Sequence, residues 1–256
     1  MHRFFVSPDT LRSGTVELQG PLARQIAVVL RLLPGERIWL LDDSGWECEV
    51  VLDAVRKDLA TGTVARRRLA SAEPRTKVTV YQGLLKGERF EYVLQKCTEV
   101  GAVGFVPLLT DRTVVGIVSE YDGQRFKRWR RIIVEAAEQA NRGRLPVLHP
   151  ASLFQAACES AAGLSLIAWE GESERGLRAL LRQSFTPGSE AGPRQERPFA
   201  VNVFVGPEGG FSEAEVKIAR RYGITPVSLG PRILRAETAA VVATAAVLHE
   251  AGDLGA

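Results

Sequence analysis

The stretch that decides the fold reads VFVGPEGGFSEAEVKIA and covers residues 203–219. A continuous apolar run leads into the glycine-rich turn GPEGG, and a helical pattern follows the turn. Ser212, with Glu215 three residues later, matches a capping box and places the helix start at residue 212 or 213. The stretch therefore predicts a buried strand, a turn with accessible backbone and a helix, which is one unit of an α/β sheet.

A second unit of the same kind follows along the chain. The sequence PVSLG (226–230) ends in a Gly-Pro turn, and an alanine-rich helix is expected over 236–250 with Glu237 at its positive end. From residue 77 onward, short apolar runs alternate with helical patterns, which predicts a mostly parallel sheet. Turns that follow parallel strands share one edge of the sheet. We therefore expect both glycine turns to line one crevice.

The glycine spacing excludes two common phosphate sites. No lysine follows Gly210, so the turn is not a phosphate loop, and it does not fit the G-x-G-x-x-G pattern of dinucleotide folds. Glu208 inside the turn would also repel phosphate. Gly206 and Gly209 lack a Cβ, which lets a flat ligand lie against the main chain. The expected ligand is uncharged or cationic at this point, although a tight turn that only joins two elements would look similar.

The first 72 residues have a different pattern. Short pieces with period-two alternation, such as ECEVVLDAV, predict half-buried antiparallel strands, and one helix is expected over 21–33. The sequence ASAEPRT (70–76) has the composition of a linker. The prediction is a small β-barrel domain over residues 1–72 and an α/β domain over residues 73–256.

Composition narrows the class of protein. The chain has 256 residues, of which 45% are apolar, and a net charge of +3. MHRFFVSPDT at the start lacks an apolar signal region, and no stretch approaches the ~18 apolar residues of a membrane span. Cys48, Cys97 and Cys158 are scattered, so we expect buried or free thiols, a cytoplasmic location and no membrane role. The three histidines are too dispersed to predict a metal site.

Two helices carry informative faces. In 88–100, Cys97 falls on the apolar stripe and is interpreted as core, not as a nucleophile. In 123–142, Trp129 is likewise placed in the core, and the other face points to solvent or a ligand; it comprises Arg128, Arg131, Glu135, Glu138 and Arg142. The cationic run RFKRWRRI (125–132) is either a solvated helix face or a strip that contacts phosphates.

Four motifs together resemble one known family. They are VGPEGGFSEAEV, LGPRILRAETA, EYVLQKCTEVGAVGFVPL and IIVEAAEQANRGRLP. They are similar to the ribosomal RNA small-subunit methyltransferase E family of the SPOUT superfamily. HRFFV and VLRLLPGERIWLLDDSG resemble its N-terminal PUA-like RNA-binding domain, so the resemblance spans nearly the whole chain. One departure is Gln25, where this family often has histidine, and no role is assigned to it.

The resemblance implies a fold and an activity. It implies a SPOUT-type, mostly parallel sheet with a C-terminal trefoil knot, beside the PUA-like barrel. It also implies a homodimer that uses S-adenosyl-L-methionine to methylate N3 of a uridine in 16S ribosomal RNA. Such a cofactor would lie against glycine-rich backbone, and its sulfonium tolerates a nearby acid. The residues nominated to hold it are Trp169, Glu170, Gly206, Glu208, Gly209, Leu229, Gly230, Ile233 and Leu234.

Roles in chemistry follow from what uridine requires. N3 carries a proton at neutral pH, so a cation should stabilise the developing charge and a carboxylate or water should accept the proton. Arg235 is the first candidate for the cation and Arg232 the second; Glu237 or Glu208 is the candidate acceptor. A structural salt bridge between Arg235 and Glu237 is the alternative. Residues expected to contact RNA phosphates are Arg3, Arg66, Arg67, Arg68, Lys127, Arg128 and Arg131.

Two rival functions remain open at this point. The chain could be an RNA-binding assembly factor without catalysis, which binding of S-adenosylmethionine would distinguish. It could also be a different α/β enzyme such as a nucleotide hydrolase. That enzyme would need metal-binding carboxylates or a phosphate loop, and neither pattern occurs.

Overall fold

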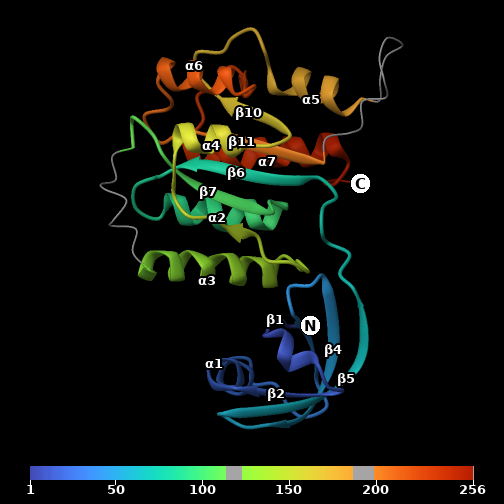
Figure 1. Cartoon of the computed structure of the whole chain (residues 1–256). Helices are drawn as coiled ribbons and strands as arrows, with labels where there is room; N and C mark the ends of the chain where they lie inside the picture. The colour runs from blue at the N-terminus through green and yellow to red at the C-terminus, as the bar shows by residue number, and fades with distance from the viewer. Residues whose placement is uncertain (114–122, 187–198, 256) are drawn as a thin grey trace. The chain divides into compact units, whose positions relative to one another are not determined.

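The computed structural model describes residues 1–113, 123–186 and 199–255. The chain divides into two compact units (Figure 1). The first unit comprises Met1–Glu73 and Ala137–Leu145, and the second comprises Pro74–Ala136 and Pro146–Ala256. The first boundary falls within the expected linker, but the segment Ala137–Leu145, expected in the second domain, belongs with the first unit.

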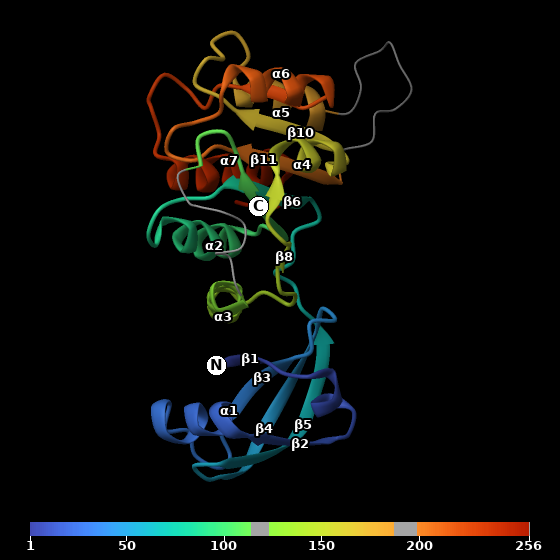
Figure 2. The ribbon, with the colours of Figure 1, turned by 60° about the vertical axis from the view of Figure 1, so that its left-hand side comes forward.

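One five-stranded sheet organises the first unit, with the order β1-β3-β4-β5-β2 (Figure 2). Its strands are β1 (Arg3–Phe5), β2 (Thr15–Gln19), β3 (Arg37–Leu41), β4 (Trp46–Val55) and β5 (Leu59–Leu69). β1 runs parallel to β3, and the other pairs are antiparallel. Within this fully described unit no pairing joins β1 to β2. The sheet is a half-barrel, and a closed PUA-like barrel stays a prediction.

The helical segment of the first unit is shorter than expected. The chain forms η1 (Pro8–Leu11), α1 (Gly20–Arg24) and, continuing from α1, the π-helical turn η2 (Gln25–Val29). Helical structure was expected to residue 33, but Arg31 has a positive φ of 55°, which ends the helix. Ile26 is fully buried and packs with Phe4, Ile38 and Leu40 in the core of this unit.

The second unit is built on a seven-stranded sheet in which every pair is parallel, which confirms the expected α/β class. The strand order is β12-β10-β11-β6-β7-β8, with β9 also paired to β7. The strands are β6 (Lys77–Gly83), β7 (Gly104–Leu109), β8 (Val147–Leu148), β9 (Ser152–Leu153), β10 (Leu164–Ala168), β11 (Ala200–Val205) and β12 (Thr225–Val227). The helices are α2 (Arg89–Val100), α3 (Gly123–Gln139), α4 (Phe154–Ser160), α5 (Leu177–Phe185), α6 (Glu213–Arg221) and α7 (Ala236–Ala251).

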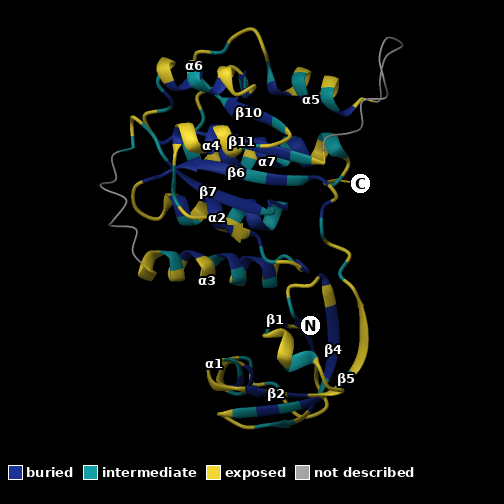
Figure 3. Cartoon of the chain, in the orientation of Figure 1, coloured by how far each residue is buried: buried dark blue, intermediate teal, exposed yellow. Residues whose placement is uncertain are grey.

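Two hydrophobic clusters cover the two faces of this sheet. The larger one joins β6 and β11 to α2, α5 and α7, and the smaller one joins the opposite face to α4 and α6. Figure 1 shows helices on both sides of the strands, and Figure 3 shows the central strands buried beneath them. Because both faces are covered, these strands are continuous apolar runs in sequence.

The helix faces assigned from the sequence are confirmed at two positions. Cys97 is fully buried on α2, receives a hydrogen bond from Thr244 of α7, and burial raises the pKa of its thiol to about 12. Trp129 on α3 is 3% exposed and packs against Phe90 at 4.4 Å between ring centroids. Neither side chain is available for nucleophilic or stacking chemistry.

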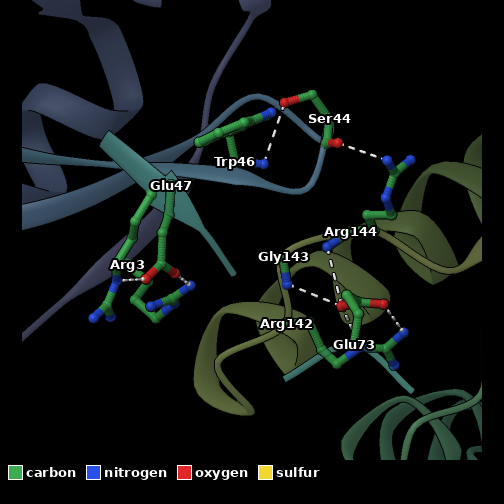
Figure 4. Close-up of polar contacts among 9 residues, drawn as sticks. Arg3, Ser44, Trp46, Glu47, Glu73, Arg142, Gly143 and Arg144 are labelled. Atoms are coloured by element: carbon green, nitrogen blue, oxygen red, sulfur yellow. Dashed lines mark hydrogen bonds and ion pairs between the residues drawn. The ribbon is translucent and has the colours of Figure 1, made fainter. Parts of the chain in front are cut away.

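Arg142 contradicts the expectation that it points to solvent or a ligand. It is 2% exposed. Its Nε and Nη2 donate to the two carboxylate oxygens of Glu73 at 2.9 and 3.0 Å (Figure 4). The backbone N–H groups of Gly143 and Arg144 donate to the same carboxylate at 2.9 and 3.2 Å. The Glu73 carboxylate therefore holds the loop after α3 against the end of the segment Met1–Glu73.

Glu73→Gln is expected to lower the free energy of unfolding by roughly 3 kcal/mol, because it leaves the buried Arg142 without its counter-charge. Burial raises the pKa of Glu73, but the bonds and charge of Arg142 and the two amides outweigh it and hold the pKa below its ordinary 4.5. The stabilisation is therefore present above pH 4.5 and fades as pH falls through the lowered value. Urea unfolding of both proteins between pH 3 and 7 measures the difference.

The matched control is Glu135→Gln, which breaks an exposed pair with Arg131 at 2.8 Å. An exposed pair of this kind contributes about 0.5 kcal/mol or less. An equal loss in both variants, or a Glu73 effect that is the same at pH 3 and pH 7, would contradict the assignment.

Candidate functional site

The carboxyl ends of four parallel strands meet at one edge of the second unit's sheet. Since β10 lies between β11 and β12, the loops that follow β11 and β12 flank the loop that follows β10. The register sets Ala168 level with Val227, and Ile167 level with both Phe204 and Pro226. The expectation that both glycine turns lie on one edge is confirmed.

Gln82 holds the GPEGG turn in place. Its side chain is 1% exposed, and its Nε2 donates to the carbonyls of Gly83 and Gly206, each at 3.0 Å. The amide oxygen of Gln82 is buried without a hydrogen-bond partner. The turn closes on itself through Gly210 N–H, which donates to the Pro207 carbonyl at 2.9 Å. One buried amide therefore joins the ends of β6 and β11.

Glu208 links this turn to the loop after β6. Its carboxylate accepts the backbone N–H of Lys86 at 3.0 Å and pairs with Arg89 at 3.2 Å. The sequence nominated Glu208 as a cofactor ligand and as a possible proton acceptor. The structure instead gives it an anchoring position between two loops. On the other side, Arg112 donates to the Gly209 carbonyl at 2.7 Å.

The glycines of this region allow close approach of backbone. A Cβ on Gly206 would lie 2.9 Å from the carbonyl carbon of Gly210, and a Cβ on Gly83 would lie 2.5 Å from the nitrogen of Pro207. A Cβ on Gly209 would meet only the side chain of Arg112, at 3.2 Å. The tightest positions are therefore Gly83 and Gly206.

The helix that follows the turn begins as the sequence predicts. Ser212 is the N-cap of α6, and its side chain and that of Glu215 form a reciprocal capping box. Ser212 Oγ also donates to Asp111 Oδ2 at 2.7 Å, and Glu215 accepts the backbone N–H of Asp111 at 3.0 Å. The cap thereby fixes the loop after β7 against the loop after β11.

The loop after β12 exposes backbone and apolar side chains. Gly230 has a φ of 117° and open space around the position of a Cβ. Leu229 and Leu234 are half-buried against the larger cluster, whereas Ile233 is 85% exposed. Arg232 is exposed as well. Four of the residues expected to bind the cofactor, Leu229, Gly230, Ile233 and Leu234, thus lie in one loop at the same sheet edge as the GPEGG turn.

A cleft of about 670 Å³ opens between the N-terminal ends of α2 and α7. We call it the α2–α7 cleft; it is lined by Lys86, Gly87, Glu88, Arg89, Tyr92, Arg235, Glu237 and Thr238. Arg235 is the N-cap of α7, and Glu237 lies in its first turn. Glu237 Oε2 is buried without a hydrogen-bond partner, and within the described residues no ion pair joins Arg235 to Glu237. The structure therefore gives no support to a salt bridge between these two residues.

Trp169 and Glu170 lie on the loop after β10. Trp169 packs partly against the smaller cluster, on the α4 and α6 face, and its ring occupies the space beside Gly171. Glu170 is exposed. Leu229 and Leu234 pack against the opposite cluster, so the structure does not bring the Trp169 side chain together with them.

The residues expected to contact RNA divide into two groups. Arg3 is 8% exposed and forms a buried ion pair with Glu47 (Figure 4), so it is wrong as a surface contact. Arg66 and Arg68 on β5 lie over the Trp39 ring and pair with Glu49 and Glu47. Arg67 lies over the Trp46 ring at 5.0 Å.

The cationic face of α3 is exposed, as predicted. Lys127 lies on it, Arg128 pairs with Glu91 at 2.7 Å, and Arg131 pairs with Glu135. The helix contains buried Trp129 between these cations, so the strip is one face of an amphipathic helix.

Sequence reasoning missed Gln82, Lys86, Arg89 and Tyr92. Gln82 lies in β6, and Lys86, Arg89 and Tyr92 follow this strand, whose carboxyl end lies beside that of β11. Residues 77 to 90 contain no motif, and Tyr92 lies in the motif EYVLQKCTEVGAVGFVPL without a role assigned to it. Adjacency of β6 to β11 depends on strand order, which periodicity does not reveal.

Membrane-spanning helices and metal-binding clusters are both absent from the described part of the chain. Every helix there is too short or too polar to traverse a lipid bilayer. The same residues hold no group of three or more histidine, cysteine, aspartate or glutamate side chains suited to a metal ion. Cys48, Cys97 and Cys158 are all buried, as expected.

Comparison with known proteins defines the class. The pattern of the RNA methyltransferase domain matches residues 72–248, which is most of the second unit. A crystal structure of a ribosomal RNA small subunit methyltransferase E from Neisseria gonorrhoeae, bound to S-adenosyl methionine, has a TM-score of 0.81 and 28% identity, with 97% of each chain covered. The chain therefore contains an RNA methyltransferase domain.

The relatives define the family within that class. The ribosomal RNA small subunit methyltransferase E of Synechocystis sp. is 34% identical over 253 residues, covering 96% of this chain and 77% of the relative. The protein of the same name from Bacillus subtilis is 30% identical over 259 residues, covering 98% and 97%. The chain belongs to the ribosomal RNA small subunit methyltransferase E family.

Proposed function

We propose that this protein transfers a methyl group from S-adenosyl-L-methionine to N3 of a uridine in 16S ribosomal RNA of the small subunit. The observation that carries the proposal is the arrangement at one sheet edge. Two glycine turns lie there beside the α2–α7 cleft, in which Arg235 forms no ion pair and Glu237 Oε2 accepts no hydrogen bond among the residues that the structure describes. Family membership and the solved relative bound to S-adenosyl methionine support it.

The residues present fit such a cofactor. The turn that contains Gly206 and Gly209 and the loop at Gly230 offer main-chain groups at this edge of the sheet, and Gly230 faces open space. Leu229, Leu234 and the exposed Ile233 supply apolar surface for an adenine ring. When bound, the cofactor would supply an activated methyl group on a sulfonium. Trp169, Glu170 and Glu208 are also proposed to contact the cofactor. In their case only main-chain atoms or the exposed parts of the side chains would reach it.

Arg235 and Glu237 are proposed to have different roles toward the uracil base. Methyl transfer requires alignment of the nucleophile and exclusion of water. The Arg235 guanidinium would stabilise negative charge on the uracil carbonyls as the N3 proton leaves, and Arg232, three residues earlier in the chain, is the second candidate. Glu237 is the preferred acceptor of that proton, because Oε2 is buried without a donor whereas Glu208 is already engaged by Lys86 and Arg89.

Exposed cations would position the RNA. Arg67 on β5, and Lys127, Arg128 and Arg131 on α3, are the proposed phosphate contacts, with Arg66 and Arg68 beside Arg67. Phosphate contacts orient a folded RNA and carry no base specificity. Such binding weakens steeply with salt.

Further features are proposed with this function. The first unit's half-barrel sheet is proposed to be the PUA-like RNA-binding domain. A trefoil knot at the C-terminus is proposed because the chain reaches β12 at the edge of the sheet and then returns to place α7 over β6 and β11. The exposed Ile233 and Val242 favour a homodimer that covers this side of α7. The proposed location is the cytoplasm.

A catalytically inactive assembly factor is the alternative, and the family relationship does not favour it. The deciding experiment maps modified nucleosides in 16S ribosomal RNA by mass spectrometry, in a strain lacking this gene and after complementation. One N3-methyluridine should disappear and return with the wild-type gene. If the modification pattern is unchanged while calorimetry detects no binding of S-adenosylmethionine, the enzymatic function is refuted.

A further inference from the structure

The α2–α7 cleft has a volume suited to a small ligand. Its ~670 Å³ falls within the range of about 300–1,000 Å³ that is typical of ligand sites. Its lining combines three cations, an aromatic ring, a hydroxyl and the two carboxylates of Glu88 and Glu237. A ligand for this cleft therefore needs a flat apolar part, a negative charge and hydrogen-bonding edges.

The positive charges of the cleft are not all equivalent. Arg89 is neutralised by Glu208 at 3.2 Å, and nearby Arg128 is neutralised by Glu91. Lys86 and Arg235 have no carboxylate within ion-pair distance among the residues that the structure describes. Two uncompensated cations at one small site attract an anion.

Tyr92 supplies a ring for stacking. It lies on α2 next to the buried Phe90 and Val93, but its own side chain is 48% exposed and lines the cleft. An exposed aromatic ring beside unpaired cations is the usual platform for an unstacked nucleobase.

The hydrogen-bonding groups of Glu237 and Arg235 determine which nucleobase would fit the cleft. Glu237 Oε2 lacks a hydrogen-bond donor, and Arg235 and Thr238 provide donors on either side in the sequence. Uracil presents an N–H between two carbonyl oxygens, which matches one acceptor among donors. Cytosine presents a bare nitrogen at the same place and would set a lone pair against the carboxylate.

We propose that the α2–α7 cleft binds the target nucleotide, with its base stacked on the Tyr92 ring and its phosphate held by Lys86. This inference rests on the proposed function and deepens it by naming the substrate-binding residues. Tyr92 and Lys86 hold the nucleotide, while Arg235 and Glu237 act on its base. The cofactor turns take no part in this binding.

The test compares five variants of the full chain with small-subunit ribosomal RNA particles as substrate. Tyr92→Ala should raise the KM for the particle roughly tenfold, as expected for loss of one stacked base. Tyr92→Phe should restore the wild-type value, because it keeps the ring. The matched control is Tyr222→Ala, which removes the ring of a similarly exposed tyrosine (40%) at the C-cap of α6, far along the chain from the cleft.

Lys86→Gln tests the phosphate contact. It should reduce the slope of log affinity against log salt by about 1. Lys217→Gln, an exposed lysine of α6, makes the same change of charge outside the cleft. Calorimetry should show wild-type affinity for S-adenosylmethionine in all of these variants.

Two outcomes overturn the inference. One is equal KM values for Tyr92→Ala and Tyr222→Ala, and the other is failure of Tyr92→Phe to restore binding. Either result, obtained with an active wild-type enzyme, leaves the proposed function intact. Failure of the proposed function is seen separately, as a wild-type protein that forms no methylated uridine.

Discussion

Arg235→Ala should lower kcat about 100- to 1,000-fold while the affinity for S-adenosylmethionine stays within about twofold. This expected decrease in kcat corresponds to the loss of one hydrogen-bond donor that stabilises negative charge in the transition state. In other enzymes, removal of one such donor typically lowers kcat by this factor. Arg235 is exposed, lines the cleft and forms no ion pair within the described residues, so its removal should leave the fold stable.

Single-turnover methylation of ribosomal particles, with calorimetry of the cofactor, separates the two effects. Arg232→Ala tests the second candidate, and Arg221→Ala on α6 is the control for loss of an exposed arginine. If Arg232→Ala shows the larger loss of kcat, the roles of the two arginines are exchanged. Unchanged turnover in both variants removes the cation from the mechanism.

Gly206→Ala should weaken S-adenosylmethionine binding at least about tenfold. The new Cβ would lie 2.9 Å from the carbonyl carbon of Gly210 and 3.2 Å from the nitrogen of Phe211. Backbone atoms cannot rotate away as side chains do, so the turn must open. Overpacking of this kind has an unfavourable free energy of about 1–3 kcal/mol, and each ~1.4 kcal/mol is tenfold in affinity.

Gly209→Ala is the matched control within the same turn. Its Cβ would meet only the flexible side chain of Arg112 at 3.2–3.4 Å, so its binding should change by less than about threefold. Calorimetry at one temperature, with thermal unfolding to check the fold, measures both. Equal affinities for the two variants would show that the cofactor does not depend on the shape of this turn.

Much of the second unit follows from local patterns. The capping box at Ser212 and the apolar run before Gly206 predict a strand, a turn and a helix without any long-range information. Parallel strands need coverage on both faces, so their apolar runs identify the sheet class. The same patterns place Cys97 and Trp129 in the core, because an amphipathic helix has one buried stripe.

Electrostatic roles were harder to predict. Arg3 and Arg142 are buried because Glu47 and Glu73 neutralise them, and these partners are distant in the sequence. Glu208 is likewise engaged by Lys86 and Arg89, which lie more than a hundred residues earlier. A charged side chain is buried only with its partner, so its exposure cannot be derived from its own neighbours along the chain.

By itself, the amino-acid sequence determined the class of fold and the two glycine turns, because these depend on local spacing of apolar residues, caps and glycines. Its motifs also carried the resemblance to the family. The tertiary structure alone decided which residues surround those turns. It placed β6 beside β11, so that Gln82, Lys86 and Tyr92 join Arg235 and Glu237 at one sheet edge. Strand order is set by packing of the whole sheet, and no segment of the chain carries it alone.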